Sequence, residues 1–95
     1  MNIDDLDIEL FKYIWILEDK VTISTIVKDM FEIKNRKEYQ RKYALIKKRL
    51  EKLAKYGILN KYRYNDSIVY TLNKNSCLIG FFINGKIVWI KLNDV

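Results

Sequence analysis

Histidine and proline are absent from this 95-residue chain, and cysteine occurs once, as Cys77. Without histidine, the chain lacks the commonest general base and the commonest metal ligand. A single cysteine excludes an intramolecular disulfide and a cysteine-based zinc site. The three glycines, Gly57, Gly80 and Gly85, are too scattered for a Walker or dinucleotide-binding loop. We therefore expect no enzymatic activity, no bound metal and no cofactor.

Long apolar runs are also missing, since no run approaches the eighteen residues of a membrane span. The acidic start Asp4-Asp5-Leu6-Asp7 is unlike a secretory signal peptide, and its carboxylates suit the first turn of a helix better than a metal site. Hydrophobic residues make up 49% of the chain and charged residues 32%, which is typical of a globular protein. We expect a single domain over residues 1–95, located in the cytoplasm, with no membrane partner.

Positive charge is concentrated in the middle of the chain. Residues 34–63 hold twelve Lys or Arg and only two acids, Glu38 and Glu51, whereas residues 1–33 carry a net charge of −5. The whole-chain charge of +6 therefore conceals a segment with a net charge of +10. Such asymmetry is typical of proteins that bind a polyanion. The alternative is a solvated helix face with no partner.

Two helices are predicted before this basic segment. The apolar spacing around Leu10 predicts a helix over 4–19, and a second apolar stripe on it consists of Ile8, Phe11 and Trp15. A helix that is apolar on two sides requires two packing partners. Ser24 is the expected N-cap of a short helix over 25–31, because serine hydroxyls accept from the free N–H groups of a first turn.

A long helix is predicted over residues 36–56. Asn35 followed by Glu38 is a capping-box pattern, and Gly57 suits the left-handed conformation that ends many helices. The inward positions repeat at steps of four and three residues: Tyr39, Tyr43, Ile46, Leu50 and Leu53. Core packing is the favoured role of the two tyrosines, with base stacking as the alternative.

Two hairpins complete the chain. Strands over 58–64 and 67–72 flank a tight Asn65-Asp66 turn, and strands over 78–83 and 86–92 flank Asn84-Gly85. Three tyrosines in the first hairpin are interpreted as half-buried sheet residues, with stacking on single-stranded nucleic acid as the alternative: Tyr62, Tyr64 and Tyr70.

This order of elements resembles the winged helix-turn-helix fold of bacterial and archaeal DNA-binding regulators. The local match runs from Tyr43 to Leu72: YALIKKRLEKLAKYGIL, followed by a basic hairpin that ends in Val-Tyr-Thr-Leu. Leu50, Leu53 and Gly57 occupy the family's buried and turning positions before the wing. The resemblance implies an α+β fold with a winged-helix core over 1–73, and the predicted C-terminal hairpin over 77–92 is an addition to that fold. The long helix begins earlier than is usual in this family.

The resemblance also implies binding of double-stranded DNA by a transcription regulator, with helix 36–56 in the major groove and wing 58–72 on the backbone or in the minor groove. An exposed helix in the major groove reads bases through Arg, Gln and small apolar side chains, while Lys reaches phosphates. The predicted contacts are Arg36, Lys37, Gln40, Arg41, Ala44, Lys47, Lys48, Lys61 and Arg63. Two alternatives remain: an architectural or replication-associated DNA binder with little sequence preference, and a winged-helix module that binds only proteins.

A homodimer is the second expected partnership. An Asn84-Gly85 turn places Gly80 opposite Trp89, and both faces of the resulting hairpin are apolar. With the second stripe of the first helix, this gives a predicted dimer interface of Ile8, Phe11, Trp15, Phe81, Ile83, Val88 and Trp89. The alternative is that the hairpin and the helix cover each other within one chain.

Overall fold

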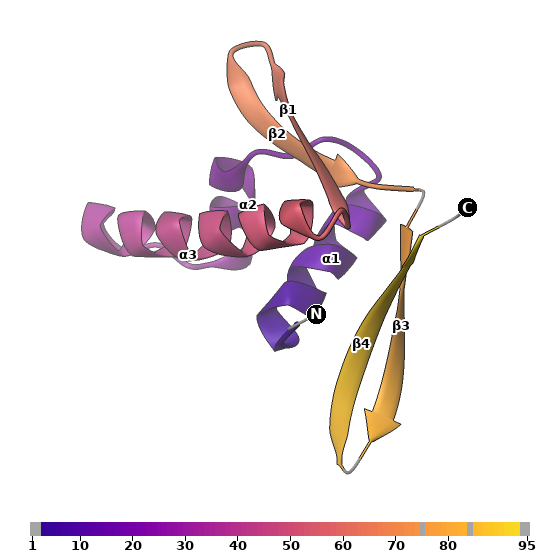
Figure 1. Ribbon diagram of the computed structural model, residues 1–95. Helices are drawn as coiled ribbons and strands as arrows, with labels where there is room; N and C mark the ends of the chain where they lie inside the picture. The colour runs from indigo at the N-terminus through magenta and orange to yellow at the C-terminus, as the bar shows by residue number, and fades with distance from the viewer. Residues whose placement is uncertain (1–2, 75, 84, 94–95) are drawn as a thin grey trace.

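Three helices precede two antiparallel hairpins in the chain (Figure 1). The computed structural model describes the backbone of residues 3–74, 76–83 and 85–93, and the side chains of residues 3–74. The helices are α1 (Asp5–Leu17), α2 (Ile23–Met30) and α3 (Arg36–Lys55), and the strands are β1 (Leu59–Tyr64), β2 (Ser67–Leu72), β3 (Ser76–Ile83) and β4 (Lys86–Asn93). The fold class is α+β, as predicted, and three helices followed by a hairpin are consistent with a winged-helix topology.

α1 is defined at both ends by local backbone chemistry. Asp4 is the N-cap, and it forms a reciprocal capping box with Asp7, because each side chain accepts the other's backbone N–H at 3.0 and 3.1 Å. The helix ends at Leu17 because Glu18 adopts a left-handed conformation with φ of 55°. The helix is thus shorter than the predicted 4–19 by one residue at its start and by two at its end.

The predicted start of α2 is wrong. Thr22, not Ser24, is the N-cap: its backbone is extended, and its hydroxyl accepts from the backbone N–H of Thr25 at 3.2 Å. The Ser24 hydroxyl instead accepts from the Tyr39 hydroxyl of α3 at 3.0 Å. The helix therefore begins two residues earlier than predicted, at Ile23.

α3 begins where the sequence predicts, at Arg36, and ends at Lys55, one residue before the predicted end, with Tyr56 as its C-cap. The Asn35 side chain accepts from the backbone N–H of Glu38 at 2.8 Å, which places the first helical residue at Arg36. Gly57 has a φ of 77°, in the left-handed region that a side chain disfavours, and the chain turns there into the wing.

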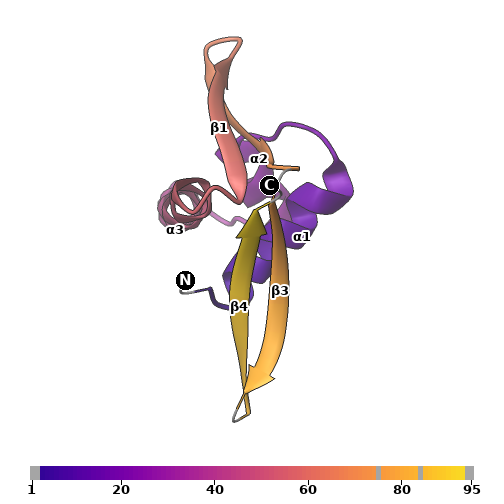
Figure 2. The same cartoon turned by 45° about the vertical axis from the view of Figure 1, so that its right-hand side comes forward.

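The hydrophobic core lies where the three helices meet the base of the first hairpin. Fully buried side chains from all of these elements form one cluster: Leu10, Ile14, Ile26, Val27, Ile46, Leu50, Leu53, Ile58, Leu59 and Tyr70. α1 and α2 pack on the inner side of α3, and the β1–β2 hairpin rises from the C-terminal end of α3 (Figures 1 and 2). Among residues 3–74, no element covers the opposite side of α3.

The β1–β2 hairpin has the register expected from a two-residue turn. Tyr64 pairs with Ser67, and both turn residues have positive φ, 48° at Asn65 and 64° at Asp66. Val21, in the segment between α1 and α2, adds a single bridge to β2, because it exchanges backbone hydrogen bonds of 3.0 and 2.9 Å with Tyr70. This segment is therefore tied to β2 by one isolated bridge, beside a sheet of two strands.

The β3–β4 hairpin extends in the opposite direction from the first hairpin (Figures 1 and 2). The two strands pair antiparallel with Gly80 opposite Trp89 and Phe82 opposite Ile87, which is the register that a two-residue turn gives. Gly85 has a φ of 76°. The side chains of this hairpin lie outside the described ones.

Candidate nucleic-acid interface

The uncovered side of α3 holds the residues that the sequence analysis assigned to DNA. The buried positions of the helix, Ile46, Leu50 and Leu53, occupy its inner side. The seven helix residues predicted to contact DNA are all exposed: Arg36, Lys37, Gln40, Arg41, Ala44, Lys47 and Lys48. At the rise of an α-helix they extend over about 18 Å, which makes one continuous basic surface.

Two cations of α3 lie on a different side and serve the fold. Arg49 contacts the Asp4 carboxylate and lies 3.5 Å from Asp7, while Lys52 forms a close ion pair with Asp7. Asp7 is fully buried, and only its Oδ2 atom has partners, whereas Oδ1 accepts no hydrogen bond from the described residues. These ion pairs hold the N-terminus of α1 against α3.

This ion cluster shifts the pKa values of two of its members, Asp4 and Arg49. The hydrogen bond from the Arg49 guanidinium lowers the pKa of Asp4 to about 2, and the same contact raises the pKa of Arg49. Both groups therefore stay charged throughout the neutral range. The sequence predicted only a helix-dipole role for Asp4 and Asp7, and no pattern in it pointed to Arg49 and Lys52 as their partners.

Lys61 and Arg63 project from β1, the first strand of the wing, and both are exposed. Lys61 donates to the Glu51 carboxylate of α3 at 2.7 Å, so it has a carboxylate partner on the helix. Arg63 stands opposite Ile68 in the register, close to the turn. Among the described side chains, no carboxylate lies within ion-pair distance of Arg63.

The twelve cations of residues 34–63 thus divide into two groups. Arg49, Lys52 and Lys61 have carboxylate partners, and Lys42 lies over the Phe31 ring at 4.7 Å. The others form no ion pair within residues 3–74: Lys34, Arg36, Lys37, Arg41, Lys47, Lys48, Lys55 and Arg63. Most of the excess positive charge is therefore available on the surface.

The tyrosines have different environments. Tyr39 is half-buried, as the core interpretation predicts, but Tyr43 remains 36% exposed. In the wing, Tyr70 is fully buried, while Tyr62 and Tyr64 are 42% and 46% exposed, more than expected for half-buried sheet residues. Lys20 lies over the Tyr64 ring at 4.4 Å, which occupies one face of that ring.

The helix part of the predicted dimer interface is partly accessible. Ile8 and Phe11 are half-buried, whereas Trp15 is 57% exposed and packs edge-on against Phe11 with 5.6 Å between ring centroids. Ile16, which the sequence analysis did not single out, is 82% exposed. The predicted partners in the C-terminal hairpin lie outside the described side chains: Phe81, Ile83, Val88 and Trp89.

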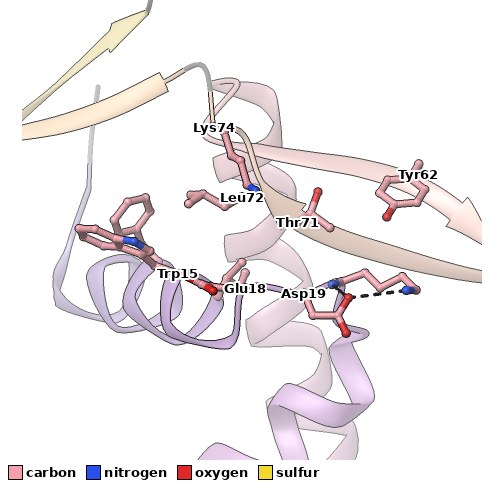
Figure 3. A pocket seen from close by; sticks show the side chains of 10 residues that line it. Trp15, Glu18, Asp19, Tyr62, Thr71, Leu72 and Lys74 are labelled. Atoms are coloured by element: carbon pink, nitrogen blue, oxygen red, sulfur yellow. Dashed lines mark hydrogen bonds and ion pairs between the residues drawn. The ribbon is translucent and has the colours of Figure 1, made fainter.

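A groove runs beside Trp15, between the end of α1 and the β1–β2 hairpin (Figure 3). Its volume is about 620 Å³. Trp15 of α1 and Glu18, the residue after α1, line one side, and Tyr62, Thr71 and Lys74 line the other from the hairpin and the residues that follow (Figure 3). No feature of the sequence pointed to this groove, because its two sides are separated by about half of the chain.

Comparison with known proteins assigns the chain to no family. No protein-family model matches it, and neither a curated protein nor a solved structure is significantly similar to it. In the part of the chain that the structure describes, no three His, Cys, Asp or Glu side chains cluster as metal ligands would, and no helix there is long and apolar enough to cross a membrane. The basic surface of α3 is thus the candidate site best supported by geometry.

Proposed function

We propose that the chain is a winged-helix protein that binds double-stranded DNA, with α3 in the major groove. The observation that carries the proposal is the uncovered side of α3, where exposed cations without ion-pair partners in residues 3–74 extend from Arg36 to Lys48. A major groove about 12 Å wide accepts one α-helix. Phosphates flank the groove on both sides, so a basic helix gains affinity wherever it enters.

In the same proposal, the wing contacts the DNA backbone. Arg63 lies near the tip of the β1–β2 hairpin, which rises from the end of α3 (Figure 1). An arginine at such a tip contacts a phosphate or enters a minor groove, most favourably where the groove is narrow. Lys61 lies two residues closer to the helix and serves as a second backbone contact.

Sequence preference, and with it a role as a transcription regulator, depends on Gln40 and Arg41. Glutamine pairs with adenine through two hydrogen bonds, and arginine pairs with guanine in the same way. Both side chains are exposed, in the second turn of α3. Binding that survives an excess of random-sequence DNA supports a regulator, whereas equal competition supports an architectural binder.

The decisive experiment measures affinity for duplex DNA at several salt concentrations, by fluorescence anisotropy. If about six phosphates are neutralised, log K falls against log salt with a slope of about −5. Absence of binding at low salt, or an affinity insensitive to salt, would refute the nucleic-acid function and favour a protein-interaction module.

We also propose that the DNA-binding form is a homodimer. The exposed Trp15 and Ile16 form an apolar surface at the end of α1, and the β3–β4 strands are rich in apolar residues. A two-stranded hairpin alone is marginally stable in water, and this one extends away from the wing. A two-fold contact that joins both surfaces also presents two copies of α3 to one duplex.

Sedimentation at micromolar concentration tests the dimer. A mass near 11.5 kDa would refute it, whereas twice that mass supports it. Trp15→Asp, Phe81→Asp and Trp89→Asp should each produce folded monomers. Asn60→Asp, which adds the same charge at an exposed position of β1, is the control and should remain dimeric.

A further inference from the structure

Glu51 is one of only two acids in the basic segment of residues 34–63. Its Oε1 atom accepts a hydrogen bond from the Lys61 amine at 2.7 Å and another from the Tyr70 hydroxyl at 2.8 Å. Lys61 lies on β1 and Tyr70 on β2, directly opposite each other in the register. A single carboxylate oxygen of α3 therefore contacts both strands of the wing.

The contact is anchored on a rigid residue. Tyr70 is fully buried, and its backbone is bridged to Val21. The neighbouring Lys61 and Tyr70 groups lower the pKa of Glu51, while burial and then the Glu51 carboxylate raise the pKa of Tyr70. At neutral pH the Glu51 carboxylate is therefore ionised, and the Tyr70 hydroxyl retains the proton that it donates.

From this geometry we infer that Glu51 is a positioning residue that holds the wing at a fixed orientation to α3. Its carboxylate therefore strengthens DNA binding, although its negative charge repels the DNA phosphates. The inference rests on the proposed function. A fixed wing presents Arg63 to the backbone without the entropy cost of ordering a mobile hairpin on binding. The benefit is thus pre-organisation, not contact, since a carboxylate does not bind phosphate.

Simple electrostatics predicts the opposite effect of Glu51, namely that its carboxylate weakens DNA binding. Removal of a carboxylate from a basic surface lowers repulsion of DNA, and it also frees Lys61 to reach a phosphate. Glu38 offers a matched control, because it is the other acid of the same segment. The Glu38 side chain has no hydrogen-bond or ion-pair partner among residues 3–74, and it lies near the start of α3, far along the helix from the wing.

The test compares Glu51→Ala, Glu38→Ala and the unmodified chain on one duplex at several salt concentrations. Glu38→Ala should bind about twofold more tightly, since it only removes a repulsive charge. Glu51→Ala should bind about fivefold more weakly, because an ion pair and a hydrogen bond that hold the wing are lost. Its salt slope should also become shallower by about one to two units, because wing cations no longer reach phosphates.

Tyr70→Phe supplies a second variant that changes no charge and keeps the buried ring. It removes only the hydroxyl that donates to Glu51, so it should weaken DNA binding in the same direction, by about twofold. Thermal unfolding defines a temperature at which every variant is folded, and binding is measured there. If Glu51→Ala fails to fold, the DNA affinity of Tyr70→Phe tests the inference on its own.

Two outcomes would overturn the inference while the proposed function stands. In one, Glu51→Ala binds as tightly as Glu38→Ala with an unchanged or steeper salt slope, which shows that Glu51 merely restrains Lys61. In the other, Tyr70→Phe binds as the unmodified chain does. If the unmodified chain fails to bind duplex DNA at low salt, the proposed function fails first, and the inference falls with it.

Discussion

The two halves of α3 carry similar positive charge but differ in what that charge contacts. In the first half, Arg36, Lys37 and Arg41 are exposed and form no ion pair with the described carboxylates. In the second half, Lys47 and Lys48 are exposed in the same way, but Arg49 and Lys52 contact Asp4 and Asp7 of α1. Arg49 and Lys52 lie in an equally basic stretch of the sequence, yet they stabilise the packing of two helices. Local charge density alone therefore does not identify the residues that face a polyanion.

This difference follows from where the acidic partners lie. Asp4 and Asp7 both precede their α3 partners by 45 residues. The capping box at the start of α1 fixes the two carboxylates, and α3 crosses them only in its second half. The first half extends beyond α1 (Figure 1), and none of its cations forms an ion pair with a carboxylate of residues 3–74. The comparison can be tested by substitutions that separate folding from DNA binding.

The largest expected effect is the loss of stability in Asp7→Ala. This substitution removes the fully buried carboxylate that pairs with Lys52 and contacts Arg49. We expect the free energy of unfolding to fall by about 2–3 kcal/mol, less than for a fully buried pair, because both cations keep some solvent exposure. Urea denaturation measures the change. Asp5→Ala, an exposed acid of the same helical turn, is the control, and an equal loss in both would contradict the role of the cluster.

Next in size is the contrast between two arginines of α3. Arg41→Ala should cost about 1–3 kcal/mol in DNA affinity and relax preference at one or two base pairs, with unfolding unchanged. Arg49→Ala should lower stability by about 1 kcal/mol and leave base preference intact. Binding titrations against a panel of duplexes, together with unfolding curves, measure both. The division of α3 fails if the two variants lose the same property, or if Gln40→Ala and Arg41→Ala both retain sequence preference.

A smaller effect is expected in the wing. Arg63→Ala should weaken binding to all duplexes by about 1 kcal/mol and reduce the magnitude of the salt slope by about 0.9, because one phosphate contact is lost. The alternative of a minor-groove contact changes affinity for A-tracts only. Asn60→Ala, at another exposed position of β1, should change neither quantity.

The smallest effect concerns pH. The folded-state pKa of Asp4 is about 2, below the usual value of 3.8, so its ion pair stabilises the fold above pH 3.8 and is lost as the pH falls toward 2. Because the Asp4 side chain is half exposed, we expect less than about 1 kcal/mol. Unfolding between pH 5 and 2 measures the loss. Asp4→Asn keeps the capping oxygen, and its stability should fall less over the same range.

Much of the fold could be predicted because its signals are local. Asn35, Glu38 and Gly57 define α3 through contacts within a few residues, and the spacing of apolar residues identifies its exposed side. The start of α2 could not be predicted in the same way. Thr22 and Ser24 both carry hydroxyls suited to capping, and the choice between them depends on Tyr39, which reaches Ser24 from another helix.

The candidate site likewise has features that could be predicted from local sequence and features that could not. Exposure of Arg41 follows from helical periodicity, because the side opposite Ile46 and Leu50 faces away from the core. The partners of Arg49 and Glu51 do not follow from periodicity, since they depend on how α1 and the wing cross α3. The exposure of Ile16 was likewise not predicted, because it lies outside both apolar stripes of α1.

The bridge between Val21 and Tyr70 has a consequence for exchange of backbone hydrogens. Each residue donates its amide hydrogen to the other across the bridge. Both amides can exchange with deuterium only when the wing separates from the segment that precedes α2. Neither residue is a proposed DNA contact. If DNA holds the wing in place as proposed, it should slow this separation, and deuterium uptake at the two amides should fall when DNA is bound.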